Sequence, residues 1–253
     1  MAPYDQFILF GDSLTQMSSG QGDGFGYQTA LQDAYSRRLD VINRGFSGYT
    51  SSMALKVLPR FFPRPETASV RFLAIYLGCN DAVMPGMYQR VPLDTYKDNV
   101  HRIVQHPVVN AQAPRILLLA PPPVNQYQLE AFDASEGVPH PSRTAARTRE
   151  YAEAVEEVGK ELGVAVVDLW GAFMKSVWWR EGDVLLGSRD TPKNEDFEGF
   201  LRMTSIDWAG LHLTGKAYKI MFDTVMEAIE KNWPDQNPDR LQMIFEDWRQ
   251  APM

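Results

Sequence analysis

The sequence predicts an α/β fold in which a five-stranded parallel sheet lies between two layers of helices. Five short apolar runs show little alternation with polar residues, which is typical of strands buried on both faces of a parallel sheet. The segments between these runs repeat apolar residues at spacings of three and four, as amphipathic helices do. Regular alternation of this kind predicts βαβ crossovers and a three-layer α/β/α sandwich.

The expected strands are rich in Val, Ile, Leu and Phe and have the length of single buried strands. They cover Phe7 to Phe10, Leu39 to Ile42, Val70 to Leu77, Arg115 to Ala120 and Val164 to Leu169. The expected helices each carry one apolar stripe, and Gly163 ends the clearest of them. These helices cover Tyr27 to Arg38, Ser52 to Phe61, Pro92 to His106, Arg143 to Leu162 and Gly215 to Trp233.

Three segments follow neither pattern. The stretch from Pro121 to Pro141 holds too many prolines for a helix or a central strand. The polar stretch from Arg180 to Asp207 is a candidate pocket wall, because ligands of open α/β sheets bind at the carboxyl ends of the strands. Near the end, a turn-rich spacer precedes Leu241 to Trp248, where we expect a last short amphipathic helix. We therefore expect one domain over residues 1–253, with a C-terminal extension from about residue 234.

Composition excludes several classes of function. The chain has 253 residues, 44% of them hydrophobic, and a formal net charge of −7, so nucleic acid is not an expected partner. No apolar run approaches the ~20 residues that span a bilayer, and no signal peptide is evident, so we expect a cytoplasmic protein without membrane insertion. The single cysteine, Cys79, excludes an internal disulfide and a multi-cysteine metal site, and no histidine has a partner at metal-ligand spacing.

Residues capable of chemistry follow the expected strands directly. Gly11-Asp12-Ser13-Leu14 follows the first strand, Gly45 lies just after the second, and Asn80 lies just after the third. Serine becomes a nucleophile when a base takes its proton, and His212, in a polar turn near the end of the chain, is the candidate base. The backbone N–H groups of Ser13 and Gly45 and the side-chain amide of Asn80 are candidate donors to an oxyanion.

These four blocks resemble those of the GDSL, or SGNH, hydrolase family, which is named after them. Ser13, Gly45, Asn80 and His212 occur in the family's order, and the chain is most similar to the isoamyl-acetate-hydrolysing esterases within it. The resemblance implies a flavodoxin-like sandwich, no metal or organic cofactor, and ester hydrolysis through an acyl-enzyme. It implies that Ser13 attacks the ester and that His212 moves the proton.

One position departs from the family pattern. The family has an aspartate three residues before the histidine, where this chain has Ala209, and the nearest carboxylate is Asp207. Loss of the acid that orients the imidazole lowers kcat by ~10⁴ in serine proteases. Three explanations compete: Asp207 substitutes, which we favour; Ser13 and His212 act as a dyad with a backbone carbonyl; or the chain has reduced activity.

Three functions are consistent with these patterns. The leading hypothesis is a serine ester hydrolase that cleaves small or medium carboxylic esters. An acyltransferase or thioesterase of specialised metabolism would use the same serine with a different acceptor. Because position 209 is alanine and not aspartate, a non-catalytic binding module on the same fold is also consistent with the sequence. The oligomeric state does not follow from the sequence.

Overall fold

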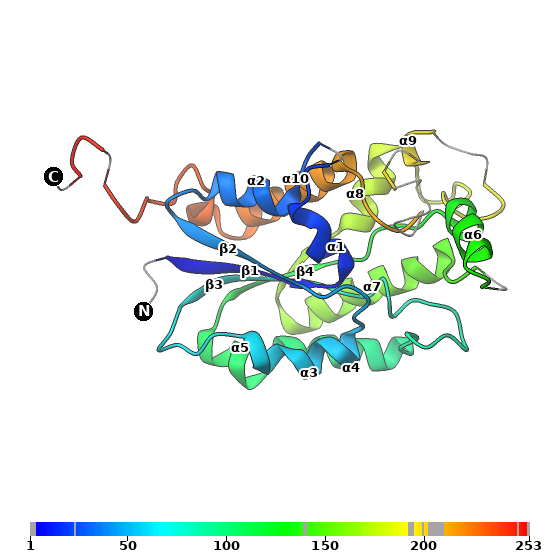
Figure 1. The fold of residues 1–253 in the computed structure, drawn as a ribbon, viewed down its shortest axis with the longest axis horizontal. Coiled ribbons are helices and arrows are strands. Elements are labelled where there is room, and N and C mark those ends of the chain that lie inside the picture. Colours follow the sequence, from blue (N-terminus) through cyan, green and yellow to red (C-terminus); the bar gives the residue numbers. More distant parts are fainter. Residues whose placement is uncertain are drawn as a thin grey trace.

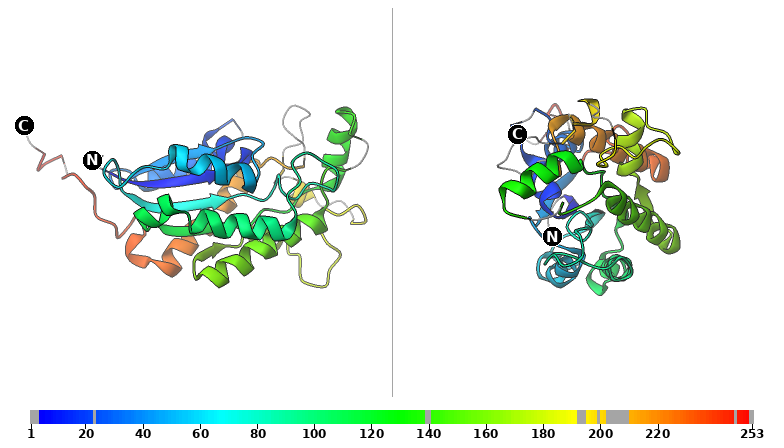
Figure 2. Two further views of the ribbon diagram at one scale, coloured as in Figure 1. Left: turned by 90° about the horizontal axis from the view of Figure 1, so that it is seen from below. Right: turned by 90° about the vertical axis from the view of Figure 1, so that its right-hand side faces the viewer.

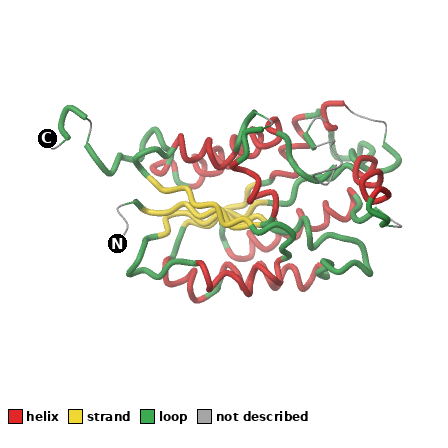
Figure 3. The backbone as a smooth tube through the Cα atoms, in the orientation of Figure 1, coloured by secondary structure: helices red, strands yellow, loops and turns green. Residues whose placement is uncertain are grey.

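A computed structural model of the chain describes residues 4–22, 24–138, 141–191, 195–198, 200–201, 210–246 and 248–251. Its centre is one five-stranded sheet with the order β2-β1-β3-β4-β5, in which all neighbouring strands are parallel. Figure 3 shows the strands as a central layer with helices on both sides. The predicted three-layer sandwich is therefore confirmed. The strands are β1 (Asp5–Gly11), β2 (Leu39–Gly45), β3 (Val70–Tyr76), β4 (Arg115–Leu119) and β5 (Ala165–Val167).

Helices cover both faces of the sheet, as the doubly wound strand order requires. In Figures 1 and 2, α2, α8 and α10 lie on one face, and α3, α4, α5 and α7 lie on the other. The longer helices are α2 (Tyr27–Ala34), α3 (Ser51–Phe61), α4 (Leu93–Val104), α6 (Gln126–Ser135), α7 (Ala145–Leu162), α8 (Leu169–Ser176) and α10 (Gly215–Asn232). The shorter ones are α1 (Ser13–Gln16), α5 (Pro107–Gln112) and α9 (Glu195–Glu198), with 3₁₀ turns at Met17–Ser19 and Pro234–Gln236.

The structure corrects two expectations about irregular segments. The stretch from Pro121 to Pro141 contains α6, because its prolines cluster at the two ends and leave the middle free to form a helix. The side chain of Asn125 caps this helix by accepting hydrogen bonds from two of its first backbone N–H groups. The prolines therefore delimit the helix instead of preventing it.

The expected helix from Leu241 to Trp248 does not form in the described part of that segment. The loop between α2 and β2 holds this stretch instead: Arg38 Nε donates to the carbonyl of Leu241 at 2.7 Å, and Ile244 donates its N–H to the carbonyl of Arg37 at 2.9 Å. The Arg37 guanidinium donates to the carbonyl of Phe245 at 2.9 Å. Tertiary partners thus take backbone groups that a helix would use, and the segment leaves the body as an arm (Figure 1).

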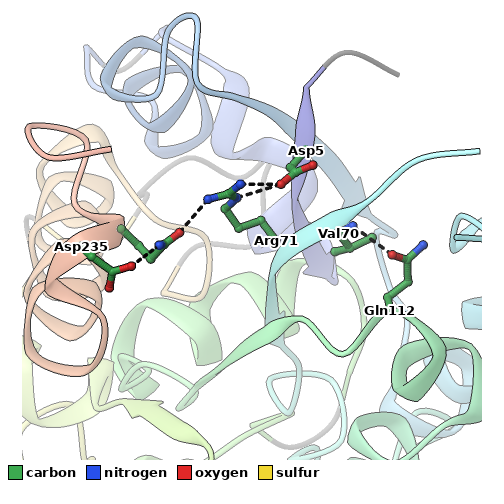
Figure 4. A network of polar contacts seen from close by, with 6 residues as sticks. Asp5, Val70, Arg71, Gln112 and Asp235 are labelled. Carbon is green, nitrogen blue, oxygen red and sulfur yellow. Dashed lines mark hydrogen bonds and ion pairs between the residues drawn. The ribbon is translucent and has the colours of Figure 1, made fainter. Parts of the chain in front are cut away.

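The amino-terminal edge of the sheet is held by polar side chains that remain partly exposed. Figure 4 shows the Arg71 side chain on β3 beside Asp5 on β1, and the Arg71 guanidinium lies 2.7 Å from the Asp5 carboxylate. The same guanidinium donates to the side-chain amide oxygen Oε1 of Gln236, beyond α10, at 3.0 Å. Gln112 at the end of α5 accepts a hydrogen bond from the Val70 N–H at 3.1 Å. These contacts fasten the 3₁₀ turn at Pro234–Gln236 and α5 to the starts of the central strands.

Candidate active site

The serine lies where β1 turns into α1, at the carboxyl edge of the sheet. Gly11 ends the strand, and a Cβ there would lie 2.4 Å from the carbonyl oxygen of Tyr76 on β3, so the tight turn requires glycine. Asp12 caps α1 by accepting a hydrogen bond from the Leu14 N–H at 2.9 Å. Ser13 is therefore the first residue of the helix, buried with only 5% of its surface exposed.

The histidine reaches the serine from the far end of the chain. His212 precedes α10, whose N-cap is Thr214, and an isolated bridge between Leu201 and Leu213 holds the approach to that helix. His212 Nε2 lies 3.1 Å from Ser13 Oγ, and both side chains are buried. This is the distance over which an imidazole can take a proton from a hydroxyl. The two predicted residues that are furthest apart in the sequence are thus in direct contact.

Asn80 follows β3 at the same edge, and two partners hold its amide. Its Nδ2 donates to the carbonyl of Tyr49 at 2.9 Å, and its Oδ1 accepts from Arg143 Nη2 at 3.0 Å. The Arg143 guanidinium is buried and also donates from Nε to the carbonyl of Cys79 at 2.6 Å. The Asn80 amide therefore has a fixed orientation, and one of its two N–H bonds is not needed for the bond to Tyr49.

Gly45 does not occupy the place that the sequence pattern predicted for it. It is the last residue of β2, and its N–H donates to Asn43 Oδ1 at 2.9 Å. A Cβ on Gly45 would lie 2.0 Å from the backbone nitrogen of Gln16, so the glycine allows α1 to pack closely against β2. A paired N–H beneath α1 is not positioned to stabilise an oxyanion at the cavity.

Gly48 is the glycine at the cavity instead. It has a positive φ of 78°, and within the part of the chain that the structure describes no group accepts a hydrogen bond from its N–H. Its carbonyl accepts from Gln89 Nε2 at 2.7 Å. A cavity of about 70 Å³ opens at this point. Its lining residues are Ser13, Ser47, Gly48, Asn80, Gln89, Arg143, Leu211 and His212.

Two buried carboxyl groups, next in sequence to Ser13 and Asn80, have raised pKa values. Burial raises the pKa of Asp12 to about 7, and the neighbouring Asp81 adds to that rise. Burial also raises the pKa of Asp81 to about 6, against the hydrogen bonds that it accepts from the N–H and the hydroxyl of Ser51. Both aspartates therefore hold loops of the site, and they do so with a marked electrostatic cost.

Other candidate groups lie outside this arrangement. Asp207 and Ala209 fall outside the described residues. Cys79 is fully buried, and burial raises the pKa of its thiol well above the usual range, so it is not poised as a thiolate nucleophile. Among the described residues, no three His, Cys, Asp or Glu side chains gather where they could hold a metal ion. None of the helices in those same residues has the length and apolar character needed to cross a membrane.

Sequence reasoning missed several residues that line the cavity, among them Gly48, Gln89 and Arg143. For Gly48 a signal existed, because it lies three residues beyond Gly45 in the same loop. Gln89 lies in the loop between β3 and α4, and Arg143 immediately precedes the cap of α7. Polar residues such as Gln89 and Arg143 are common in loops, so only their tertiary contacts indicate that they belong to the site.

Comparison with known proteins agrees with this geometry. The model of the GDSL-like lipase/acylhydrolase family matches residues 9–220. The chain is 31% identical over 242 residues to a GDSL esterase/lipase of Arabidopsis thaliana, covering 92% of this chain and 89% of the relative. It is 29% identical over 252 residues to the isoamyl acetate-hydrolyzing esterase of Saccharomyces cerevisiae, covering 97% and 94%. The crystal structure of a lipase/acylhydrolase from Enterococcus faecalis superposes with a TM-score of 0.62 at 20% identity, covering 94% of this chain and 98% of that one.

Proposed function

The chain belongs to the GDSL-like lipase/acylhydrolase family and is a carboxylic ester hydrolase, and we propose that it acts through an acyl-enzyme on Ser13. The observation that carries the proposal is the 3.1 Å separation of Ser13 Oγ and His212 Nε2 within one buried cavity. A hydroxyl and an imidazole in this arrangement supply a nucleophile and its base.

Acylation needs one proton to move twice. Ser13 Oγ attacks the ester carbonyl carbon while its proton passes to His212 Nε2, and the carbonyl oxygen becomes an oxyanion. The bond to the alcohol oxygen then breaks, and His212 returns the proton to that departing oxygen. Water repeats the sequence in the second half: it gives a proton to His212 and attacks the acyl carbon, and Ser13 leaves with the proton as the carboxylic acid is released.

Three N–H donors are available for the oxyanion. The N–H of Ser13 lies at the start of α1, where helix geometry leaves backbone donors without acceptors. The N–H of Gly48 and the second N–H of the Asn80 amide belong to residues that line the same cavity. We therefore assign the glycine donor to Gly48 instead of Gly45. Loss of one such donor costs ~2.7–4 kcal/mol of transition-state stabilisation.

The size of the cavity favours a small acyl group. Its volume of about 70 Å³ equals about twice the share of liquid volume that a water molecule takes, ~30 Å³. An acetyl-sized group fits this space. The name of the yeast relative, an isoamyl acetate-hydrolyzing esterase, agrees with the ester of a short acid. The proposed substrates are therefore small-molecule esters, with acetate esters first among them.

The test of the nucleophile combines labelling and turnover. A fluorophosphonate should label Ser13 in the native protein, and Ser13→Ala should remove the label and lower turnover of p-nitrophenyl acetate by about 10⁴-fold or more. The matched control is Ser36→Ala, which changes an exposed serine just beyond the carboxyl end of α2 and should change neither readout. Turnover that persists in the Ser13→Ala variant would refute the proposal.

We propose further that Asp207 orients the imidazole of His212 in place of the acid missing at position 209. Asp207→Asn should then lower kcat by up to ~10⁴-fold with little change in KM, because the tautomer and orientation of the imidazole are lost. Introducing Ala209→Asp into that variant should recover part of the rate. Unchanged kcat in Asp207→Asn would instead favour a Ser13–His212 dyad.

A further inference from the structure

We propose that Gln89 limits the length of the acyl chain, by separating the catalytic cavity from a larger apolar cavity that is a second acyl subsite. This inference rests on the proposed function of Ser13 and concerns the specificity of the same site. It assigns a substrate class to each cavity: acetate esters to the catalytic cavity alone, and esters of longer straight-chain acids to the two cavities joined.

The larger cavity lies beside the catalytic one and measures about 250 Å³. The side chains that belong to it alone are predominantly apolar. The apolar ones come from α3 and from the loop between β3 and α4, and Ser142 comes from the segment that precedes α7. Its lining residues are Gly48, Met53, Val83, Met87, Tyr88, Gln89, Ser142 and Arg143. Methionine side chains adapt their shape to what they contact, so such walls suit a flexible hydrocarbon chain.

The two cavities share one wall, made of Gly48, Gln89 and Arg143. Within this wall, Gln89 is the side chain that can move. It is half-buried and reaches across to donate from Nε2 to the Gly48 carbonyl at 2.7 Å. Gly48 has no side chain, and the Arg143 guanidinium is buried and held by the Asn80 side chain and the Cys79 carbonyl. The barrier between the cavities is therefore the Gln89 side chain.

The chemistry of the reaction says which half of the ester lies on this side. The departing alcohol oxygen must receive its proton from His212, so the alcohol lies on the side of the cavity formed by Leu211 and His212. The shared wall contains neither of these residues and no atom of Ser13. The larger cavity consequently adjoins the acyl half of the substrate, beyond the proposed oxyanion donor Gly48.

This arrangement predicts short-acyl specificity in the native protein and a latent capacity for longer acids. With Gln89 bonded to Gly48, an acyl chain has only the catalytic cavity. Shortening Gln89 would join the cavities and bring the surfaces of Val83 and Met87 within reach of the chain. Burial of each methylene then raises kcat/KM by about fourfold, so four methylenes provide up to about 250-fold.

The experiment compares kcat/KM for p-nitrophenyl acetate, butanoate and hexanoate. In Gln89→Ala the hexanoate-to-acetate ratio should rise at least about tenfold over that of the native protein. Gln89→Met keeps the bulk of the side chain but removes the hydrogen bond to Gly48, and it should keep the native ratio. Adding Met87→Trp to Gln89→Ala refills the larger cavity and should return the ratio toward its native value.

The control is Arg90→Ala, which changes an exposed neighbour in the same loop and should leave the ratio unchanged. A Gln89→Ala ratio within about twofold of the native one, with acetate still hydrolysed, overturns the inference. Loss of all turnover in both Gln89 variants, with Ser13 still labelled by a fluorophosphonate, also overturns it, because Gln89 would then act only by holding Gly48. Failure of the proposed function is separately visible, since the native protein would hydrolyse no ester and take no label.

Discussion

The two edges of the parallel sheet carry polar side chains of very different kinds. At the amino-terminal edge, Arg71 and Asp5 form an ion pair whose side chains are 26% and 33% exposed. At the carboxyl edge, Asp12, Asp81 and Arg143 lie together with almost no exposed surface. Water therefore solvates and screens the charges at the amino-terminal edge, but it does not reach those at the carboxyl edge.

This difference indicates that the carboxyl edge, where the candidate site lies, contains buried charged groups that lower the stability of the fold. The Asp12 carboxyl has one oxygen, Oδ2, that is buried and without a hydrogen-bond partner in the described part of the chain. Burial lowers the pKa of the Arg143 guanidinium and raises the pKa values of both aspartates. Buried groups of this kind are costly unless paired, and clusters of shifted pKa values occur preferentially at functional sites. The described contacts at the amino-terminal edge tie neighbouring elements of the fold together.

The largest effect is expected when the buried guanidinium is removed. Arg143→Met should lower kcat by ~10²–10³-fold with a smaller change in KM, because the Asn80 amide loses the partner that orients it toward the oxyanion. Steady-state kinetics with p-nitrophenyl acetate measure this split. Arg143→Lys keeps a positive charge but loses the forked arrangement of guanidinium donors. Its kcat should lie between those of Arg143→Met and the native protein. A fall in stability with native kcat would show that Arg143 supports only the fold.

The second prediction concerns the pH dependence of stability. The folded-state pKa of Asp12 is about 7, above its ordinary value of 3.8, so the folded protein binds more protons than the unfolded chain between these pH values. The free energy of unfolding should therefore fall as the pH rises from about 4 to about 7, with a contribution on the order of a few kcal/mol.

Denaturant unfolding at several pH values tests this expectation. Asp12→Asn keeps the cap of α1, because its amide oxygen can accept from the Leu14 N–H, but it cannot ionise. The variant should show a shallower decline in stability across the same pH range. Asp81→Asn should show a smaller change, since the pKa of Asp81 is raised only to about 6. A decline as steep in Asp12→Asn as in the native protein would contradict the prediction.

The smallest effect is expected at the opposite edge. Arg71→Met removes a partly exposed ion pair and the bond to Gln236, and it should lower the free energy of unfolding by about 1 kcal/mol or less. Its kcat/KM for p-nitrophenyl acetate should equal that of the native protein. A large loss of activity in this variant would erase the distinction between the two edges.

The sequence predicted the sheet well because buried parallel strands produce apolar runs that polar loops interrupt. It also indicated that Ser13, Asn80 and His212 meet, since residues that follow parallel strands share one edge. It failed for Gly45 because the second strand was expected to end at Ile42, whereas β2 continues to Gly45 through pairing with β1. The loop at the edge therefore starts three residues later, and the glycine that lines the cavity is Gly48.

Other parts of the site depend on contacts that no local pattern encodes. Arg143 was expected to begin an amphipathic helix. In the structure its guanidinium contacts Asn80, which lies 63 residues earlier in the loop after β3. Gln89 lies in a loop without periodicity, and its role depends on the carbonyl of Gly48. The short arm after α10 was expected to be helical because it is amphipathic, but arginines of the first half of the chain take its carbonyl groups.

The contact between Ser13 and His212 joins residues 199 positions apart. During synthesis the serine leaves the ribosome early, and the histidine emerges only when most of the chain has been made. The Ser13–His212 pair can therefore form only near the end of synthesis. Contacts this distant in sequence also form slowly during folding. In refolding from denaturant, recovery of ester turnover should therefore follow the return of secondary structure, and enzyme activity serves as a direct reporter of completed assembly.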